Sequence, residues 1–334
     1  MHIANELLSV PVALSSLAIA AGSMGIICKK ARQAITSDRI ALMGIMGAFI
    51  FAAQMVNFQL PMMPGTSGHM VGAVLLAIIL GPHAGAIVIT SVIIIQCLIF
   101  QDGGLLALGC NIINMALVPS YLGYFLYRSV TAGPFSNLRT YIGAMVGCII
   151  AIELGAILVV IEAAISGVLV VPFSTFLITM VGVHLLVGFV EGLVTVAVLG
   201  YIQQVRPDMV SGSLHGKIRL SKKAMLVTLA VFTVITAGGL SLFACGFPDG
   251  LEWSYAERPD QPEFGAIISN EDPTIAKVDD FQTRYSPMPD YSIRTTKKAS
   301  SAWTSFAGVT GAAITMLLVW STAKILRRKK IVKA

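Results

Sequence analysis

Charged residues are scarce in this chain, and their scarcity sets its class. Asp, Glu, Lys and Arg make up 12% of the 334 residues, whereas 56% are hydrophobic and the mean hydropathy is +0.81. A soluble globular protein carries about 25% charged residues. The composition therefore excludes an ordinary soluble protein and predicts an all-α integral membrane protein.

Paired cysteines and common catalytic signatures are also missing. Five cysteines are present, without paired spacing, at Cys28, Cys97, Cys110, Cys148 and Cys245. This pattern supports neither a disulfide framework nor a zinc motif. The chain has no G-x-x-x-x-G-K-[ST] run, no nucleophile elbow and no H-E-x-x-H sequence, so we expect it to hydrolyse neither ATP nor peptides and not to be an enzyme.

Long apolar stretches are abundant instead, and they predict about nine transmembrane helices for a hydrocarbon layer of about 30 Å. The stretches are 10–28, 39–58, 68–81, 83–100, 105–127, 140–165, 174–203, 224–244 and 303–326. We expect a seven-helix body over 1–205, a basic cytoplasmic linker over 206–223 and a two-helix appendage over 224–334. Between the two appendage helices lies a polar extracytoplasmic segment, 246–300, which begins with a Pro248-Asp249-Gly250 turn. We expect it to follow an irregular path without a core of its own.

The distribution of charge predicts the orientation of these helices. Segment 246–300 contains ten of the 17 acidic residues, while 17 of the 23 basic residues fall in the other loops on a single side. By the positive-inside rule, the N-terminus lies outside and the C-terminus in the cytoplasm of a multi-pass cell (inner or plasma) membrane protein. The net charge of +6 thus reflects topology and not nucleic-acid binding.

The first residues, Met1-His2-Ile3, predict a metal chelate. A free amino terminus followed by histidine offers the Met1 amine, the deprotonated His2 amide and His2 Nδ1, which close fused five- and six-membered rings around one ion. This planar set of nitrogens suits Ni(II) or Cu(II) and leaves one equatorial position open. Histidine is second in a few per cent of chains by composition alone, and the interpretation depends on residues 2–9 leading directly into a membrane helix.

His69 is our candidate for the fourth nitrogen. It begins the stretch 68–81, whose 14 residues span only about 21 Å as a helix, so we expect the preceding loop 59–67 to enter the membrane where protein shields its backbone. The alternative is a histidine whose hydrogen bonds are satisfied by the backbone of that loop. Nearby thioethers, of Met55, Met62, Met63 and Met70, would instead select Cu(I) in a copper-binding membrane sensor, although packing explains them as well.

Polar residues near the fourth and fifth stretches are candidates for orienting the imidazoles. They are Gln101, Asn111 and Asn114, with Gln96 and Asp102 beside them. Ligating histidines usually donate their second N–H to an oxygen. Structural hydrogen bonds between helices explain the same residues.

Three titratable residues lie inside apolar stretches and support a different class of function. Glu153, His184 and Glu191 could relay protons in a proton-coupled secondary metal carrier. Alternatively, they form a buried polar lock between helices. His184 and Glu191 are two helical turns apart, which favours the lock.

Several motifs resemble one transporter family over about residues 1–207. They are Met1-His2-Ile3, Pro64-Gly65-Thr66-Ser67-Gly68-His69, Leu80-Gly81-Pro82, Phe100-Gln101-Asp102-Gly103-Gly104-Leu105, Gly109-Cys110-Asn111-Ile112-Ile113-Asn114-Met115, His184 to Glu191-Gly192, and Arg206-Pro207-Asp208. They look like the CbiM/NikM-type substrate-capture (S) component of nickel and cobalt energy-coupling-factor (ECF) transporters. The segment Pro248-Asp249-Gly250-Leu251-Glu252-Trp253 is similar to the CbiN/NikN-like two-helix accessory component, here fused.

The resemblance implies a binding site, partners and a substrate. In the family the metal is held by the Met1 amine, the amide and side-chain nitrogens of His2, and a histidine matching His69. Import is driven by ATP through a transmembrane coupling subunit and two cytoplasmic ATPase subunits, supplied by other chains. Planar geometry and the Ser67-Gly68-His69-Met70 context favour Ni(II) over Co(II). The chain departs from its relatives at Ala4-Asn5-Glu6-Leu7, where a Pro-Asp-Gly turn is common, so the path of the N-terminal loop stays open.

Overall fold

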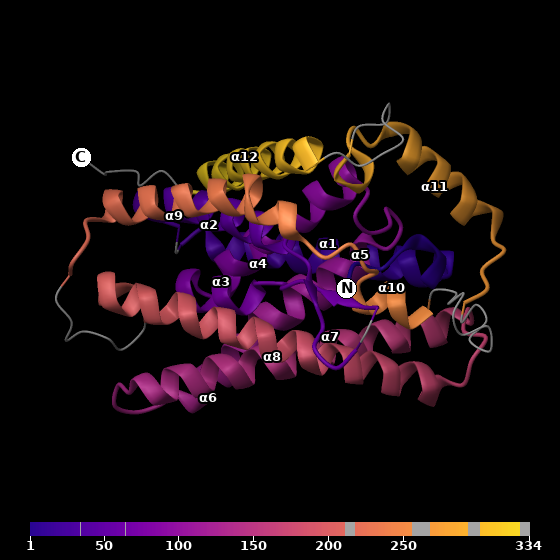
Figure 1. Ribbon diagram of the computed structural model, residues 1–334, viewed down its shortest axis with the longest axis horizontal. Coiled ribbons are helices and arrows are strands. Elements are labelled where there is room, and N and C mark those ends of the chain that lie inside the picture. The colour runs from indigo at the N-terminus through magenta and orange to yellow at the C-terminus, as the bar shows by residue number, and fades with distance from the viewer. Residues whose placement is uncertain (34, 64, 211–217, 256–267, 293–300, 328–334) are drawn as a thin grey trace.

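A computed structural model describes residues 1–33, 35–63, 65–210, 218–255, 268–292 and 301–327. Its long helices lie side by side along the long axis of the molecule (Figure 1). The helices are α1 (Val10–Ala31), α2 (Ser37–Gln54), α3 (Ala73–Leu80), α4 (Pro82–Ile95), α5 (Leu108–Asn111), α6 (Tyr124–Val130), α7 (Asn137–Ser166), α8 (Phe173–Val205), α9 (Lys222–Gly238), α10 (Gly250–Tyr255), α11 (Pro273–Tyr285) and α12 (Ser301–Leu326).

Six helical segments of the described chain are long and apolar enough to cross a membrane. They are Val10–Ala31, Pro82–Phe100, Asn137–Ser166, Phe173–Val205, Lys222–Phe243 and Ala302–Leu326. The prediction of an all-α membrane protein is therefore confirmed. The count of about nine crossings stays a prediction. The other three apolar stretches form α2, the short α3, and a segment in which α5 and α6 are separated by π-helical turns.

The short α3 is preceded by a loop that folds back on itself. Strands β1 (Phe58–Gln59) and β2 (Ser67–Gly68) pair antiparallel, with Phe58 opposite Gly68. Gly72 then has a left-handed backbone with φ +78°, which glycine adopts without a steric penalty. A Cβ there would lie 2.5 Å from Ile50, so glycine also permits the close approach of α2. This loop carries His69 into the bundle.

Wide helical turns occur on both sides of the loop at 101–107. The segment Gln96–Phe100 that extends α4 is a π-helix, as are Ile112–Leu117 and Pro119–Gly123 between α5 and α6. Such turns are rare and are frequently found at functional sites. Gln101 follows in a left-handed conformation with φ +58°, and the Asp102 N–H donates back to the Gln96 carbonyl at 3.0 Å. The backbone thus reverses direction between Gln96 and Asp102, and both side chains contact His2.

The appendage packs directly against the body. Helices α9 and α12 both contact α2. The glycines of α2 allow this contact, because a Cβ on Gly44 or Gly47 would lie 3.3 Å or less from side chains of α12 and α4. The small-residue face of α2 therefore serves internal packing.

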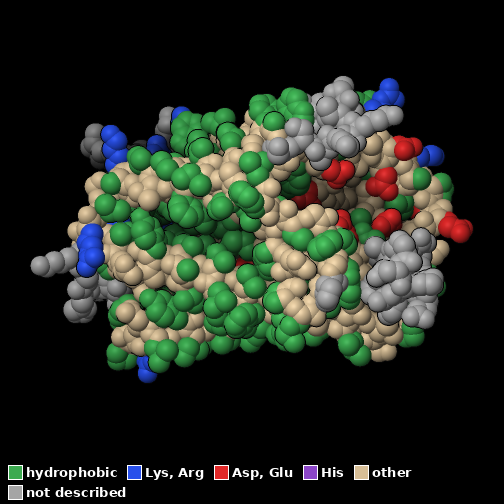
Figure 2. Space-filling view, viewed as in Figure 1, with side chains coloured by type: hydrophobic (Ala, Val, Ile, Leu, Met, Phe, Trp, Pro, Cys, Tyr) green, Lys and Arg blue, Asp and Glu red, His purple; other side chains and the backbone are tan. Residues whose placement is uncertain are grey.

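Charge divides the two ends of the molecule. Figure 2 shows most acidic side chains around a hollow at the end that carries α10 and α11, and basic side chains gathered at the opposite end. Helices α10 and α11 belong to the segment for which we predicted an irregular path. They are short, and they lie against the N-terminal residues of the chain.

Candidate metal site

The N-terminal residues lie inside the protein. Met1, His2 and Ile3 are 5%, 8% and 0% exposed. The Ile3 N–H donates to Asn111 Oδ1 at 2.7 Å, and the Ile3 carbonyl accepts from Gly104 N–H at 2.8 Å and from Asn111 Nδ2 at 3.2 Å. Asn111, a predicted orienting residue, therefore holds the backbone beside His2 and not the imidazole itself.

Asn5 fixes the path of the N-terminal loop. Residues Asn5–Leu7 form one 3-10 turn, and Asn5 Oδ1 accepts from Leu106 N–H at 2.7 Å and from Ala107 N–H at 3.3 Å. Its Nδ2 donates to Asp279 Oδ1 on α11 at 2.5 Å. The turn that replaces Pro-Asp-Gly is thus held from both the body and the appendage.

A chain of side-chain amides fixes the tautomer of His2. The Val71 carbonyl can only accept, so the Gln54 amide nitrogen donates to it at 2.7 Å. Gln54 Oε1 then accepts from Gln96 Nε2 at 2.7 Å, which leaves Gln96 Oε1 to accept from His2 Nε2 at 3.1 Å. His2 Nε2 therefore carries the hydrogen, and the lone pair of a neutral ring is on Nδ1.

His2 Nδ1 faces a carboxylate without a hydrogen bond. It lies 3.0 Å from Asp102 Oδ1, but it is a buried nitrogen with no hydrogen-bond partner among the described residues. A buried nitrogen without a partner is costly unless a cation or proton binds it. Asp102 is anchored at its other oxygen, which accepts from Tyr291 OH at 2.6 Å.

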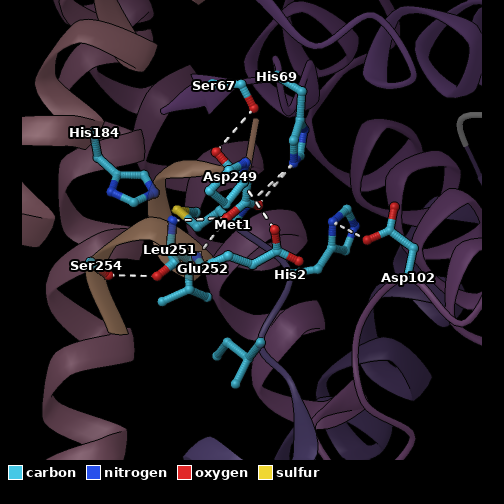
Figure 3. A network of polar contacts seen from close by, with 12 residues as sticks. Met1, His2, Ser67, His69, Asp102, His184, Asp249, Leu251, Glu252 and Ser254 are labelled. Atoms are coloured by element: carbon cyan, nitrogen blue, oxygen red, sulfur yellow. Dashed lines mark hydrogen bonds and ion pairs between the residues drawn. The ribbon is translucent and has the colours of Figure 1, made fainter. Parts of the chain in front are cut away.

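His69 presents its own lone pair to the amino terminus. Its Nδ1 lies 3.2 Å from the Met70 carbonyl, an acceptor, so Nδ1 carries the hydrogen. Nε2 lies 3.2 Å from the Met1 nitrogen. The rings of His2 and His69 stack with centroids 5.3 Å apart and planes 20° apart. Both imidazoles and the amine are seen together in Figure 3.

Glu191 secures the loop that carries His69. Its carboxylate accepts from Val71 N–H at 2.6 Å and from Gly72 N–H at 3.0 Å. His184 Nδ1 instead donates to the Met180 carbonyl of its own helix at 2.8 Å. Glu191 and His184 thus have separate partners, which supports a structural role for each.

A carboxylate from the appendage completes the cluster. Asp249 Oδ2 accepts from the Met1 ammonium at 2.5 Å and lies 3.7 Å from His69 Nε2. Its other oxygen caps α10, accepting from Leu251 N–H at 2.8 Å and Glu252 N–H at 2.9 Å. Burial alone would raise the pKa of Asp249, but the Met1 ammonium and His69 hold that pKa well below its usual value. Asp249 is therefore ionised at neutral pH.

A cavity of roughly 660 Å³ leads to this cluster. We call it the vestibule. It is lined by His2 and His69 and by five carboxylates contributed by both the body and the appendage: Asp102, Asp249, Glu252, Asp279 and Asp290. Figure 2 shows its acidic rim. Clustered negative charge around a hollow raises the local concentration of cations.

Two other residues singled out from the sequence have partners outside the cluster of Met1, His2, His69 and Asp249. Gln101 donates to Thr283 of the appendage at 2.7 Å, and Asn114 donates to Glu162 Oε2 at 2.7 Å. Both oxygens of Glu153 are buried without a hydrogen-bond partner in the described part of the chain. Met62 is 92% exposed, so its thioether is not part of the buried cluster.

Side chains alone do not complete a metal site here. Across the described ranges, no group of three His, Cys, Asp or Glu side chains is placed to hold a metal ion. The Met1 amine and the His2 amide are backbone atoms and lie outside that set of side chains. Sequence reasoning placed both imidazoles but missed Gln54, Asn5 and Asp249. An Asp-Gly pair was visible at 249–250, and it was interpreted as a turn and as part of the accessory-component motif, without a role at the metal site.

Known proteins match both parts of the chain. Residues 2–209 match the family described as cobalt uptake substrate-specific transmembrane region, and residues 223–328 match the PDGLE domain. A putative fused nickel transport protein NikMN of Archaeoglobus fulgidus is 36% identical over 253 residues, which cover 75% of this chain and 81% of that protein. A probable fused nickel transport protein LarMN of Lactiplantibacillus plantarum is 31% identical over 77% of this chain and 79% of that protein.

A solved structure agrees with these matches. The crystal structure of a truncated transition metal transporter is 32% identical, with a TM-score of 0.53, and covers 60% of this chain and 98% of that one. The family match spans more than half of the chain, and every relative named above is a transport protein. The chain therefore belongs to the family of cobalt-uptake substrate-specific transmembrane proteins, as a membrane transport component and not an enzyme, fused to a PDGLE region.

Proposed function

We propose that this chain is the substrate-capture component of an ATP-driven ECF-type importer of divalent transition metal, with Ni(II) as the main substrate and Co(II) as the alternative. One observation carries the proposal. The Met1 amine and His69 Nε2 lie 3.2 Å apart at one buried point, and the ring of His2 stacks on His69 with its Nδ1 turned to Asp102 Oδ1 at 3.0 Å. These nitrogens belong to the four-nitrogen set expected from the sequence.

Capture requires only reversible ligation. The Met1 ammonium and the His2 amide each lose a proton, and the two imidazoles are already in the tautomers that offer Nδ1 of His2 and Nε2 of His69. Four nitrogens in a plane suit low-spin Ni(II). Gln96 and the Met70 carbonyl act on the remaining ring N–H groups and keep the ligand nitrogens available.

The remaining parts of the importer are supplied by other chains. We propose a transmembrane coupling subunit and two cytoplasmic ATPase subunits as partners, with residues 1–205 as the capture domain, 206–223 as a linker and 224–334 as the accessory unit. Basic residues at one end of the molecule and acidic residues at the other support an N-terminus outside the cell and a cytoplasmic C-terminus (Figure 2).

Visible absorption of the purified chain tests the binding site. The protein with its native amino terminus is mixed with Ni(II) or Co(II), and the same is done for His2→Ala, His69→Ala and a variant with one residue added before Met1. We expect a yellow one-to-one nickel complex that all three changes abolish. Retention of the complex after the added residue would rule out the N-terminal chelate.

A proton-coupled carrier is the second candidate, and it is favoured by the buried carboxylate of Glu153, which has no hydrogen-bond partner in the part of the chain that the structure describes. The two functions differ in their energy source. Uptake by an importer stops when the ATPase partners are omitted and continues with a protonophore present, provided ATP is maintained. Uptake by the chain alone that collapses with the proton gradient would replace the importer by the carrier.

A further inference from the structure

His69 Nε2 is spaced from Met1 N and from Asp249 Oδ2 as two ligands of one metal ion would be. Met1 N lies 3.2 Å from His69 Nε2 and 2.5 Å from Asp249 Oδ2, and the last two atoms are 3.7 Å apart. For metal–ligand bonds of about 2.0–2.2 Å, two ligands of one ion are about 3 Å apart at a right angle and about 4 Å apart when opposite each other. Asp249 Oδ2 therefore lies where it can bind the same ion as His69.

Asp249 lies at the boundary between two cavities. The vestibule is lined by His69 and Asp249 but not by Met1. A second, smaller cavity is lined by Met1 together with His69 and Asp249. An ion that arrives through the vestibule thus meets His69 and Asp249 before it reaches the amine.

The amine is not free to bind an ion in this arrangement. Its nitrogen lies 2.5 Å from Asp249 Oδ2 in a short, buried ion pair. A hydrated divalent cation can exchange a water for a carboxylate oxygen without any proton leaving the protein. Because Asp249 lines the vestibule and Met1 does not, binding to the carboxylate precedes binding to the amine.

We propose that Asp249 is an entry ligand for the transported cation. This step rests on the proposed function. The ion first binds Asp249 Oδ2 and His69 Nε2, and Asp249 thereby releases the ammonium. The Met1 ammonium and the His2 amide then each lose one proton to water in the vestibule, their nitrogens bind the ion, and the bond to Asp249 breaks. No electron is transferred.

The two oxygens of Asp249 have different partners, so one substitution can change the contact to the amine and keep the helix cap. Oδ1 caps α10 and Oδ2 meets the amine (Figure 3). An asparagine side chain at this position keeps a carbonyl oxygen for the cap, since asparagine is as good an N-cap as aspartate, but its amide nitrogen does not bind a cation. Asp249→Asn therefore tests the entry role while α10 remains capped.

Glu252→Gln is the matched control. Glu252 also lines the vestibule and belongs to the same helix, and its Oε2 accepts from Asp249 N–H at 3.2 Å, which a glutamine oxygen can also do. The substitution removes one negative charge from the cavity without changing the group at the amine. It measures how much of any effect comes from the general field of the vestibule.

Stopped-flow absorbance with the full chain and Ni(II) measures the rate at which the final complex forms, and equilibrium titration measures its stability. We expect Asp249→Asn to slow formation at least about tenfold while the final spectrum stays that of the wild type, and Glu252→Gln to slow it at most about twofold. Equal slowing by both variants, or a wild-type rate for Asp249→Asn, would overturn the entry role.

Two further outcomes separate this inference from the proposed function. If Asp249→Asn forms no final complex, Asp249 belongs to the permanent ligand set and the entry role is wrong. If the wild type forms no nickel complex, or His2→Ala and His69→Ala still form it, the proposed N-terminal chelate fails whatever Asp249 does.

Discussion

A histidine is a useful metal ligand only when the correct ring nitrogen lacks a proton, and two glutamine amides decide this for His2. The Val71 carbonyl sets the direction of the chain through Gln54 and Gln96, which ends at His2 Nε2. This series of hydrogen bonds begins at Val71, two residues after His69. One short backbone segment therefore positions His69 and also sets the tautomer of His2. Residues that orient metal-bound histidines typically contribute about 10- to 100-fold in affinity.

Replacing the amide beside His2 tests this arrangement. We expect Gln96→Leu to weaken nickel binding about 10- to 100-fold, because Nε2 loses its acceptor and either ring nitrogen can then carry the hydrogen. Equilibrium titration with Ni(II) measures the effect. Gln203→Leu is the control, because Gln203 accepts from Tyr141 at 3.1 Å, away from the cluster, and we expect its nickel affinity to be unchanged. Equal affinities for both variants would contradict the tautomer argument.

Protons compete with the metal for the same nitrogens, which gives the pH dependence its sign. The Met1 amine and the His2 amide bind nickel only after losing their protons, so nickel affinity falls as pH falls. Each displaced proton changes the apparent affinity about tenfold per pH unit over the range in which the free group is protonated. Titrations at pH 6, 7 and 8 measure this slope. A flat profile would mean that neither group is a ligand.

The loop between α4 and α5 is the element on which the N-terminal segment rests, and glycine makes the contact possible. A Cβ on Gly104 would lie within 3.0 Å of the Asn5 backbone nitrogen and side chain, and a Cβ on Gly103 would lie 2.9 Å from Asn111 Nδ2. Overpacking of this kind costs about 1–3 kcal/mol. The N-terminal segment contacts this loop directly, because the Gly104 N–H donates to the Ile3 carbonyl at 2.8 Å, so an added Cβ displaces that segment.

Gly104→Ala is therefore expected to weaken nickel binding at least about fivefold, because the shifted N-terminal segment no longer places Met1 and His2 beside His69. Gly22→Ala in α1 is the matched control, since nothing lies within 4 Å of its Cβ position, and its affinity should equal that of the wild type. Isothermal titration of both variants, with thermal melting to compare their stability, measures the difference. A wild-type affinity for Gly104→Ala would show that the loop is not rigid.

The helices and the loop contacts differ in how well they could be predicted from the sequence. Apolar length predicted the long helices, and the chemistry of a second-position histidine pointed to Met1, His2 and His69, which the structure brings together. The roles of Asn5, Gln54 and Asp249 depend on contacts between segments far apart in the chain, and no periodicity reports such contacts. Helix α11 had a readable start, because Asp272 caps it through the Thr274 N–H and Pro273 follows, but its polar composition favoured an irregular interpretation.

At the scale of the whole molecule, the appendage covers the amino terminus. Gln282 of α11 donates to the carbonyls of Cys97 and Gly103 at 3.1 and 2.8 Å, and Asn270 donates to the carbonyls of Glu6 and Leu8. At the opposite end, Lys222 of α9 pairs with Asp38 of α2 at 2.7 Å. In the described residues, the fused unit thus contacts the body at both ends of the molecule and along α2, and α10 and α11 help to shape the vestibule.

The vestibule can supply metal only if it opens to the outside of the cell, and labelling of single cysteines tests this orientation. In a variant in which serine replaces Cys28 and Cys245, we expect Lys277→Cys on α11 to react with a membrane-impermeant maleimide on intact cells. Lys29→Cys at the basic end should react only after the membrane is permeabilised. Both lysines are exposed, so access to the reagent decides the result. The reverse pattern would place the acidic vestibule in the cytoplasm, where it could release metal but not capture it from outside, and the proposed import function would fail with it.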